Sequence, residues 1–164
     1  DGMVWGLFPI LLATKDFKLD EIATIVAVYP IFWGVGQLFT GKMADVFDKK
    51  KMLFLGMLLQ GVALLSMIYA TTFWHFAILS SVLGIGTAIV YPTFLAGIGD
   101  YTHPEQRAKS IGIFRLWRDS GYAFGAIITG IISDIWNINT SIALIGGLTI
   151  ISALIIQIRM KSKV

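Results

Sequence analysis

The chain has 164 residues, of which 56% are hydrophobic and 14% are charged, with a formal net charge of +3. A soluble globular domain has about 25% charged residues. Here the charges separate apolar runs of about 20 residues, the length that crosses about 30 Å of hydrocarbon. The composition therefore excludes an ordinary soluble domain and indicates an integral protein of the lipid bilayer. The basic excess flanks the apolar runs, so we expect no nucleic-acid partner, and the absence of cysteine excludes disulfides.

Six apolar segments predict an all-α membrane protein with six transmembrane helices. They cover residues 2–14, 22–41, 52–70, 75–98, 110–135 and 141–158. The first segment is too short to cross the hydrocarbon, and the chain opens with Asp1 rather than Met. We therefore expect the first helix to be truncated and upstream sequence to be missing.

Lysine and arginine are distributed unevenly over the segments that connect these helices. One set of alternate connections has only Lys15 and Lys18, and the other set has nine basic residues: Lys42, Lys49, Lys50, Lys51, Arg107, Lys109, Arg159, Lys161 and Lys163. Basic residues concentrate on the cytoplasmic side of membrane proteins. We therefore predict a multi-pass protein of the cell (inner) membrane whose C-terminus is cytoplasmic.

Small residues recur at helical spacing in two of the segments. They are Gly121 with Gly125, Ala126 with Gly130, and the set Ser80, Gly84 and Ala88. Small residues on one face of a helix let helices approach closely in lipid, so these sets predict tight helix contacts. For any single pair, the high frequency of glycine in membrane helices is an equally good explanation.

Two prolines stand at comparable places in the two halves of the chain. Pro9 lies near the outer end of the first helix, and Pro92 lies near the inner end of the fourth. These positions correspond if helices 1–3 and 4–6 form a 3+3 inverted repeat, and interrupted helices at such positions point to the substrate pathway of a transporter. The alternative is that the two prolines are unrelated kinks that neighbouring helices tolerate.

The segment between the second and third helices, residues 36–51 (GQLFTGKMADVFDKKK), resembles the signature loop of the major facilitator superfamily. The family pattern reads Gly-x-x-x-Asp-(Arg/Lys)-x-Gly-x-(Arg/Lys)-(Arg/Lys). Two positions depart from it, Val46 and Asp48, as in the weaker copy of the second half of such transporters. Four positions match it at the family spacing: Gly41, Asp45, Lys50 and Lys51.

The similarity extends to YPIFWGVGQLFTG and RAKSIGIFRLWRDSGYAFGA, which resemble the eighth and eleventh helices of bacterial drug-efflux-like members. The resemblance implies that residues 1–164 are the C-terminal half of a twelve-helix transporter, helices seven to twelve, with the N-terminal half missing but acting as partner. It also implies alternating-access transport of a small organic solute, as efflux or uptake coupled to protons or another ion. The matching loop residues and Arg115 would form a cytoplasmic gate.

The fifth helix contains three charged residues, Arg115, Arg118 and Asp119. Charges within a span are costly and are retained when they are paired or face water. Arg115 and Asp119 are four residues apart and can pair on one face. One interpretation makes Asp119 a proton-titrating or cation-recognising group with Arg115 as its partner. The other assigns this end of the helix to the cytoplasmic gate.

Polar aromatic residues indicate where a substrate could bind. Tyr29, Trp33 and Gln37 are spaced four apart on the second helix, and Tyr91 and Tyr122 add hydroxyl groups from the fourth and fifth. A cavity for amphipathic organic molecules needs such groups, although an aromatic stripe is also what ordinary packing produces.

No other chemistry is indicated by the sequence. His75 and His103 lie at opposite membrane faces and cannot share a metal ion, and no catalytic cluster or nucleotide-binding motif stands out. We therefore expect no enzyme activity, metal or cofactor. The alternative to a transporter is a non-transport membrane protein, in which six helices serve as an assembly module or receptor.

Overall fold

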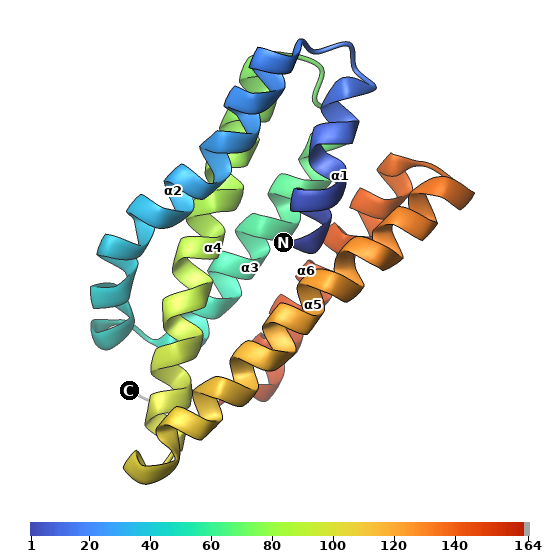
Figure 1. Ribbon diagram of the computed structural model, residues 1–164. Helices are drawn as coiled ribbons and strands as arrows, with labels where there is room; N and C mark the ends of the chain where they lie inside the picture. Colours follow the sequence, from blue (N-terminus) through green and yellow to red (C-terminus); the bar gives the residue numbers. More distant parts are fainter. Residues whose placement is uncertain (163–164) are drawn as a thin grey trace.

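The computed structural model describes residues 1–162 as a bundle of α-helices (Figure 1). The α-helices are α1 (Gly2–Ala13), α2 (Leu19–Val46), α3 (Lys49–Met67), α4 (Phe73–Tyr101), α5 (Arg107–Ile135) and α6 (Ile138–Arg159), with a 3₁₀ helix η1 (Pro104–Gln106) before α5. The all-α prediction is confirmed for this part of the chain. Four helices, α2, α3, α4 and α6, are long and apolar enough to cross a membrane, whereas α1 has only 12 residues. The prediction of six spans is therefore supported for four helices.

The connection between α2 and α3 is much shorter than predicted. Helix α2 continues past Gly41 to Val46 and α3 begins at Lys49, so the expected loop over residues 42–51 is wrong and only residues 47–48 lie outside a helix. The side chain of Asp48 caps α3 by accepting a hydrogen bond of 2.8 Å from the backbone N–H of Lys50. The Ser162 hydroxyl also donates to Asp48 and lowers the pKa of that carboxyl, which ties the C-terminal segment to this turn.

Side chains also cap the starts of α4 and α6. Thr72 begins α4 by accepting a hydrogen bond from the backbone N–H of His75, and Asn137 begins α6 by accepting one of 2.8 Å from Thr140. Helix α4 extends to Tyr101 and α5 begins at Arg107, so most of the predicted loop over residues 99–109 is helical. Hydropathy alone missed these extensions because the terminal turns of a membrane helix are polar.

The basic residues gather at one end of the bundle. The α2–α3 and α4–α5 connections lie at this end, near the C-terminus, and the other connections lie at the opposite end (Figure 1). Of the nine basic residues counted above, only Lys163 lies outside the described residues. An ion pair of 3.1 Å between Lys49 and Asp100 joins α3 to α4 here. At the opposite end, the Lys15 ammonium donates to the backbone oxygen of Ala70 at 3.0 Å.

Helix α4 forms the centre of the bundle, because it packs against both α2 and α3, while α3 also packs against α6 and α1 packs against α5. The predicted small-residue face of α4 makes these contacts. A β-carbon added to Gly84 would lie 2.5 Å from the Tyr29 carbonyl oxygen of α2, and Ala88 faces Gly36. The tight contacts predicted for Gly84 and Ala88 are therefore confirmed.

The small residues of α5 are packed less tightly than their spacing predicts. Gly121 and Gly130 have open space around them among the described residues, whereas Gly125 and Ala126 face Gly2 of α1. The prolines also behave differently from the expectation of interrupted helices. Pro9 lies inside α1 and Pro92 inside α4, and both helices continue through them.

Candidate functional site

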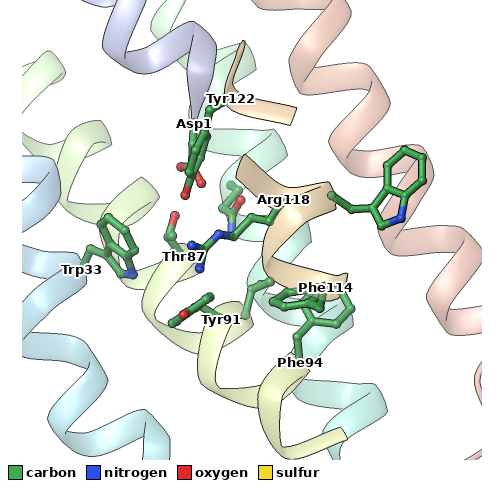
Figure 2. Close-up of a pocket in the computed structure, with 11 residues that line it drawn as sticks. Asp1, Trp33, Thr87, Tyr91, Phe94, Phe114, Arg118 and Tyr122 are labelled. Atoms are coloured by element: carbon green, nitrogen blue, oxygen red, sulfur yellow. The ribbon is translucent and has the colours of Figure 1, made fainter. Parts of the chain in front are cut away.

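A pocket of about 370 Å³ lies among helices α2, α3, α4 and α5 and the residue before α1, near the middle of the bundle (Figure 2). Its volume is within the range of about 300–1,000 Å³ that is typical of small-molecule sites. Helix α4 supplies one wall, α5 the facing wall, and α2 and α3 one residue each. The residues that line it are Asp1, Trp33, Gln60, Thr87, Val90, Tyr91, Phe94, Phe114, Trp117, Arg118 and Tyr122.

Among the described residues, Arg118 is the one that lines this pocket with a basic side chain. It extends from α5 into the space between Asp1 and Tyr91 (Figure 2). Its guanidinium carbon lies 4.8 Å from the centre of the Tyr91 ring and 5.9 Å from that of Tyr122, both within cation–π range. Aromatic faces stabilise the charge without neutralising it, so the pocket presents a positive group with an apolar surround.

The counter-ion of Arg118 lies outside the pocket lining. The Asp119 carboxylate accepts a hydrogen bond from Nε at 2.8 Å and forms an ion pair with Nη2 at 2.7 Å, and its side chain is 55% exposed. We expected Asp119 to pair with Arg115, four residues away. The structure pairs it with the adjacent Arg118 instead.

Three aromatic rings connect the pocket to the core of α2. Tyr29 stacks on Trp33 with ring centroids 6.0 Å apart, and Trp33 meets the edge of Tyr91 at 6.5 Å. Such pairs stabilise one another beyond simple burial. The Trp33 indole Nε1–H is buried and has no hydrogen-bond acceptor in the described part of the chain. An unmatched donor at the pocket wall is unusual, because buried polar groups are nearly always paired.

Tyr29 is itself buried, with 1% of its surface exposed, and holds the pocket edge in place. Its hydroxyl donates a hydrogen bond to the Asp1 carboxylate and lies 3.3 Å from the hydroxyl oxygen of Thr87. The carboxylate that lines the pocket is thus already engaged. Tyr29 therefore contacts residues of the pocket wall and does not line the pocket itself.

The structure brings together some of the residues predicted for a substrate or proton pathway. Trp33, Tyr91 and Tyr122 line the same pocket. Gln37 is half-buried and lies outside the pocket lining, as does Asp119, which reaches the pocket only through Arg118.

The residues predicted for a gate lie along two helix ends and on α5. Gly41 and Asp45 belong to the last turns of α2, and Lys50 and Lys51 to the first turn of α3. Gly41 has open space around it among the described residues, so it does not mediate a close helix contact within them. Asp45 and Arg115 are exposed, and neither forms an ion pair within residues 1–162.

Several lining residues were not singled out from the sequence. A signal for those on α5 was present, because Phe114, Arg118 and Tyr122 have the same spacing of four as the stripe on α2. Gln60 on α3 is not part of such a stripe, and only the packing of α3 against α4 brings it to the pocket. The missed residues are Gln60, Thr87, Val90, Phe94, Phe114, Trp117 and Arg118.

Comparison with known proteins gives a consistent result. A family model described as Major Facilitator Superfamily matches residues 1–162. The inner membrane transport protein YnfM of Escherichia coli is 26% identical over 156 residues, which are 93% of this chain and 37% of that protein. The methyl viologen resistance protein SmvA of Salmonella typhimurium is 28% identical over 127 residues, 77% of this chain and 26% of that protein.

A fungal protein is similar as well. The multidrug transporter AQR1 of Candida glabrata is 28% identical over 125 residues, which are 75% of this chain and 21% of that protein. The chain therefore spans less than half the length of each of these relatives.

Proposed function

The chain belongs to the major facilitator superfamily, and on this premise we propose that it is the C-terminal six-helix half of a secondary active transporter, residues 1–164 forming helices seven to twelve. The whole protein would move a small organic solute across the membrane by alternating access, coupled to protons or another ion. The observation that carries this proposal is the pocket of about 370 Å³ in the middle of a membrane bundle, lined by aromatic rings and Arg118.

Two matching helix contacts support a 3+3 inverted repeat. A β-carbon added to Gly84 on α4 would meet the Tyr29 carbonyl oxygen of α2. One added to Gly2 on α1 would overlap the Tyr122 carbonyl oxygen of α5. The proposed repeats are α1–α3 and α4–α6, so α1 and α4 are their first helices and α2 and α5 their middle helices. In both contacts, a glycine on the first helix of one repeat approaches a tyrosine on the middle helix of the other repeat.

The distribution of charge supports the proposed orientation. Lys49, Lys50 and Lys51 begin α3 at the end of the bundle that also carries Arg107 and the C-terminal segment. Since basic residues favour the cytoplasmic side, we place this end in the cytoplasm of a cell whose inner membrane holds the protein.

Exposed apolar residues on two helices support an interface with the N-terminal half of the same transporter. Leu38 on α2 is 77% exposed and Trp117 on α5 is 75% exposed, and both helices carry further exposed apolar residues. Lipid would cover some of this surface. The N-terminal half would cover the rest and would bring an Arg or a helix end to Asp45, the gate residue that has no ion-pair partner within residues 1–162.

Reconstitution of the full-length polypeptide that contains residues 1–164 tests the proposed function. Proteoliposomes with an imposed pH gradient would be offered a panel of radiolabelled aromatic acids, amines and neutral drugs. We expect at least one solute to accumulate, and dissipation of the gradient to abolish the accumulation. Binding of solutes without movement across the bilayer would favour a receptor or assembly module instead.

Asp45→Ala is expected to slow the conformational cycle about tenfold, the effect of losing one charge-assisted contact of about 1.4 kcal/mol in the transition between states. Substrate affinity should stay nearly intact, because Asp45 lies in the last turn of α2, outside the pocket lining. Substrate counterflow measures cycling, and equilibrium binding measures affinity.

Asp20→Ala serves as the matched control, since Asp20 lies in the first turn of the same helix at the opposite end. It should leave both quantities unchanged. A large loss of affinity with normal turnover in Asp45→Ala would contradict the gate assignment.

A further inference from the structure

We infer that the pocket binds an aromatic organic anion, and that the carboxylate of this solute replaces Asp119 as the partner of Arg118. The inference rests on the proposed function and names the substrate class for its site. Three observations carry it: the position of Arg118 in the pocket, the exposure of its present counter-ion, and the unmatched indole N–H of Trp33.

The pair between Arg118 and Asp119 is of a kind that can be exchanged. The two residues are neighbours on one helix, a spacing at which side chains do not face each other, so the helix itself does not hold them together. More than half of the Asp119 side chain is exposed, and exposed ion pairs contribute little. Asp119 can therefore turn away from Arg118 when another carboxylate arrives.

The guanidinium of Arg118 can bind the carboxylate of the solute without moving. Asp119 engages Nε and Nη2 of Arg118, and a guanidinium has five N–H donors in a planar fork that suits a carboxylate. The rings of Tyr91 and Tyr122 hold the group at the pocket wall. An anion bound there would make charge-assisted hydrogen bonds in an apolar surround, where they are strong.

The uncharged donors in the pocket favour the same ligand. Trp33 Nε1–H is buried with no acceptor within residues 1–162, and the amide of Gln60 lines the same space. An ionised carboxylate is purely an acceptor. The aromatic walls formed by Phe94 and Phe114, whose ring centroids lie 5.7 Å apart, suit a flat apolar body beside it.

A cationic solute fits the same surfaces less well. The faces of Tyr91 and Tyr122 that would receive a cation are already occupied by Arg118. The carboxylate of Asp1, which lines the pocket, accepts a hydrogen bond from Tyr29. A cation bound against these rings would therefore lie beside the guanidinium charge.

Three probes with the same ring system test the inference on the purified full-length polypeptide: 2-naphthoate, 2-naphthamide and 2-naphthyltrimethylammonium. We expect equilibrium dialysis to show that 2-naphthoate binds about tenfold or more tightly than the other two, the effect of a hydrogen-bonded charge pair. Arg118→Gln should remove this preference. Asp119→Asn should strengthen 2-naphthoate binding, because it removes the competing carboxylate.

Two further variants separate recognition from folding and from bulk charge. Trp33→Phe keeps an aromatic ring and removes the N–H, so it should weaken 2-naphthoate several-fold and weaken 2-naphthamide less, because the amide oxygen is an uncharged acceptor. Lys109→Gln removes one positive charge from the exposed start of the same helix as Arg118 and should change nothing.

The inference is overturned if the cation or the amide binds as tightly as 2-naphthoate, if 2-naphthoate does not bind, or if Asp119→Asn weakens it as much as Arg118→Gln. Transport of cations with no anion preference would overturn the inference and leave the proposed function standing. Arg118-dependent binding of 2-naphthoate, with no movement of any solute across the bilayer, would support the inference and contradict transport.

Discussion

Asp119→Asn is expected to abolish uptake driven by a pH gradient, down to the level of protein-free vesicles. Asparagine matches aspartate in size but cannot gain or lose a proton, so it breaks coupling if protonation of Asp119 is the step that releases Arg118 to the solute. The groups near this pair are Tyr122 on the same helix, Tyr91 on α4 and the Asp1 carboxylate at the start of α1. Uptake into full-length proteoliposomes at several imposed pH gradients measures the effect.

Counterflow of labelled substrate at equal pH distinguishes the two roles considered for Asp119. Exchange needs the helices to move but needs no net proton transfer. If Asp119 carries the proton, Asp119→Asn keeps counterflow while it loses pH-driven uptake; if Asp119 is only part of the gate, both are lost together.

Asp134→Asn is the matched control for this prediction. Asp134 is an exposed acidic residue near the other end of α5, outside the pocket lining. It should leave pH-driven uptake at the wild-type level. Unchanged uptake by Asp119→Asn at every pH would remove the proposed coupling role.

The presence of the helices and the concentration of basic residues in alternate connections could be predicted from the sequence, because both depend on the hydropathy and charge of contiguous residues. The ends of α2 and α3 could not, since they depend on a capping interaction at Asp48 and on ordinary helix formation by the polar residues 42–46. A polar helical turn and a polar loop have the same hydropathy. For this reason the signature residues Gly41 and Asp45 were expected in a loop and lie in a helix.

The pocket was only partly predictable, because its wall is assembled from four helices and Asp1, which are distant from one another in the sequence. Trp33, Tyr91 and Tyr122 were found as polar aromatic residues on separate helices. Arg118 was not chosen because the rule of spacing by four favoured Arg115 as the partner of Asp119, and that rule describes preferred faces rather than the reach of a long side chain. Which helix faces meet is decided by close contacts, above all the one at Gly84.

Gly84→Ala is expected to destabilise the full-length protein and to weaken its pocket. The added methyl group would lie 2.5 Å from the Tyr29 carbonyl oxygen and 3.1 Å from the Trp33 backbone nitrogen. These are main-chain atoms of α2, so a side-chain rotation cannot relieve the overlap and α2 must move away from α4. Overpacking of this kind costs about 1–3 kcal/mol. Thermal unfolding in detergent, followed by tryptophan fluorescence, measures the loss.

Gly97→Ala makes the same chemical change on the same helix. It therefore separates the effect of the overlap with α2 from the effect of replacing a glycine by an alanine in a helix. Gly97 has no described atom within 4 Å of an added β-carbon, so alanine there should leave stability unchanged or raise it by up to about 1 kcal/mol. If Gly84→Ala were equally harmless, α2 and α4 would not be in the close contact that positions Tyr29 beneath the pocket and Trp33 at its wall. Solute binding should then also survive the substitution, whereas displacement of α2 would lower stability and affinity together.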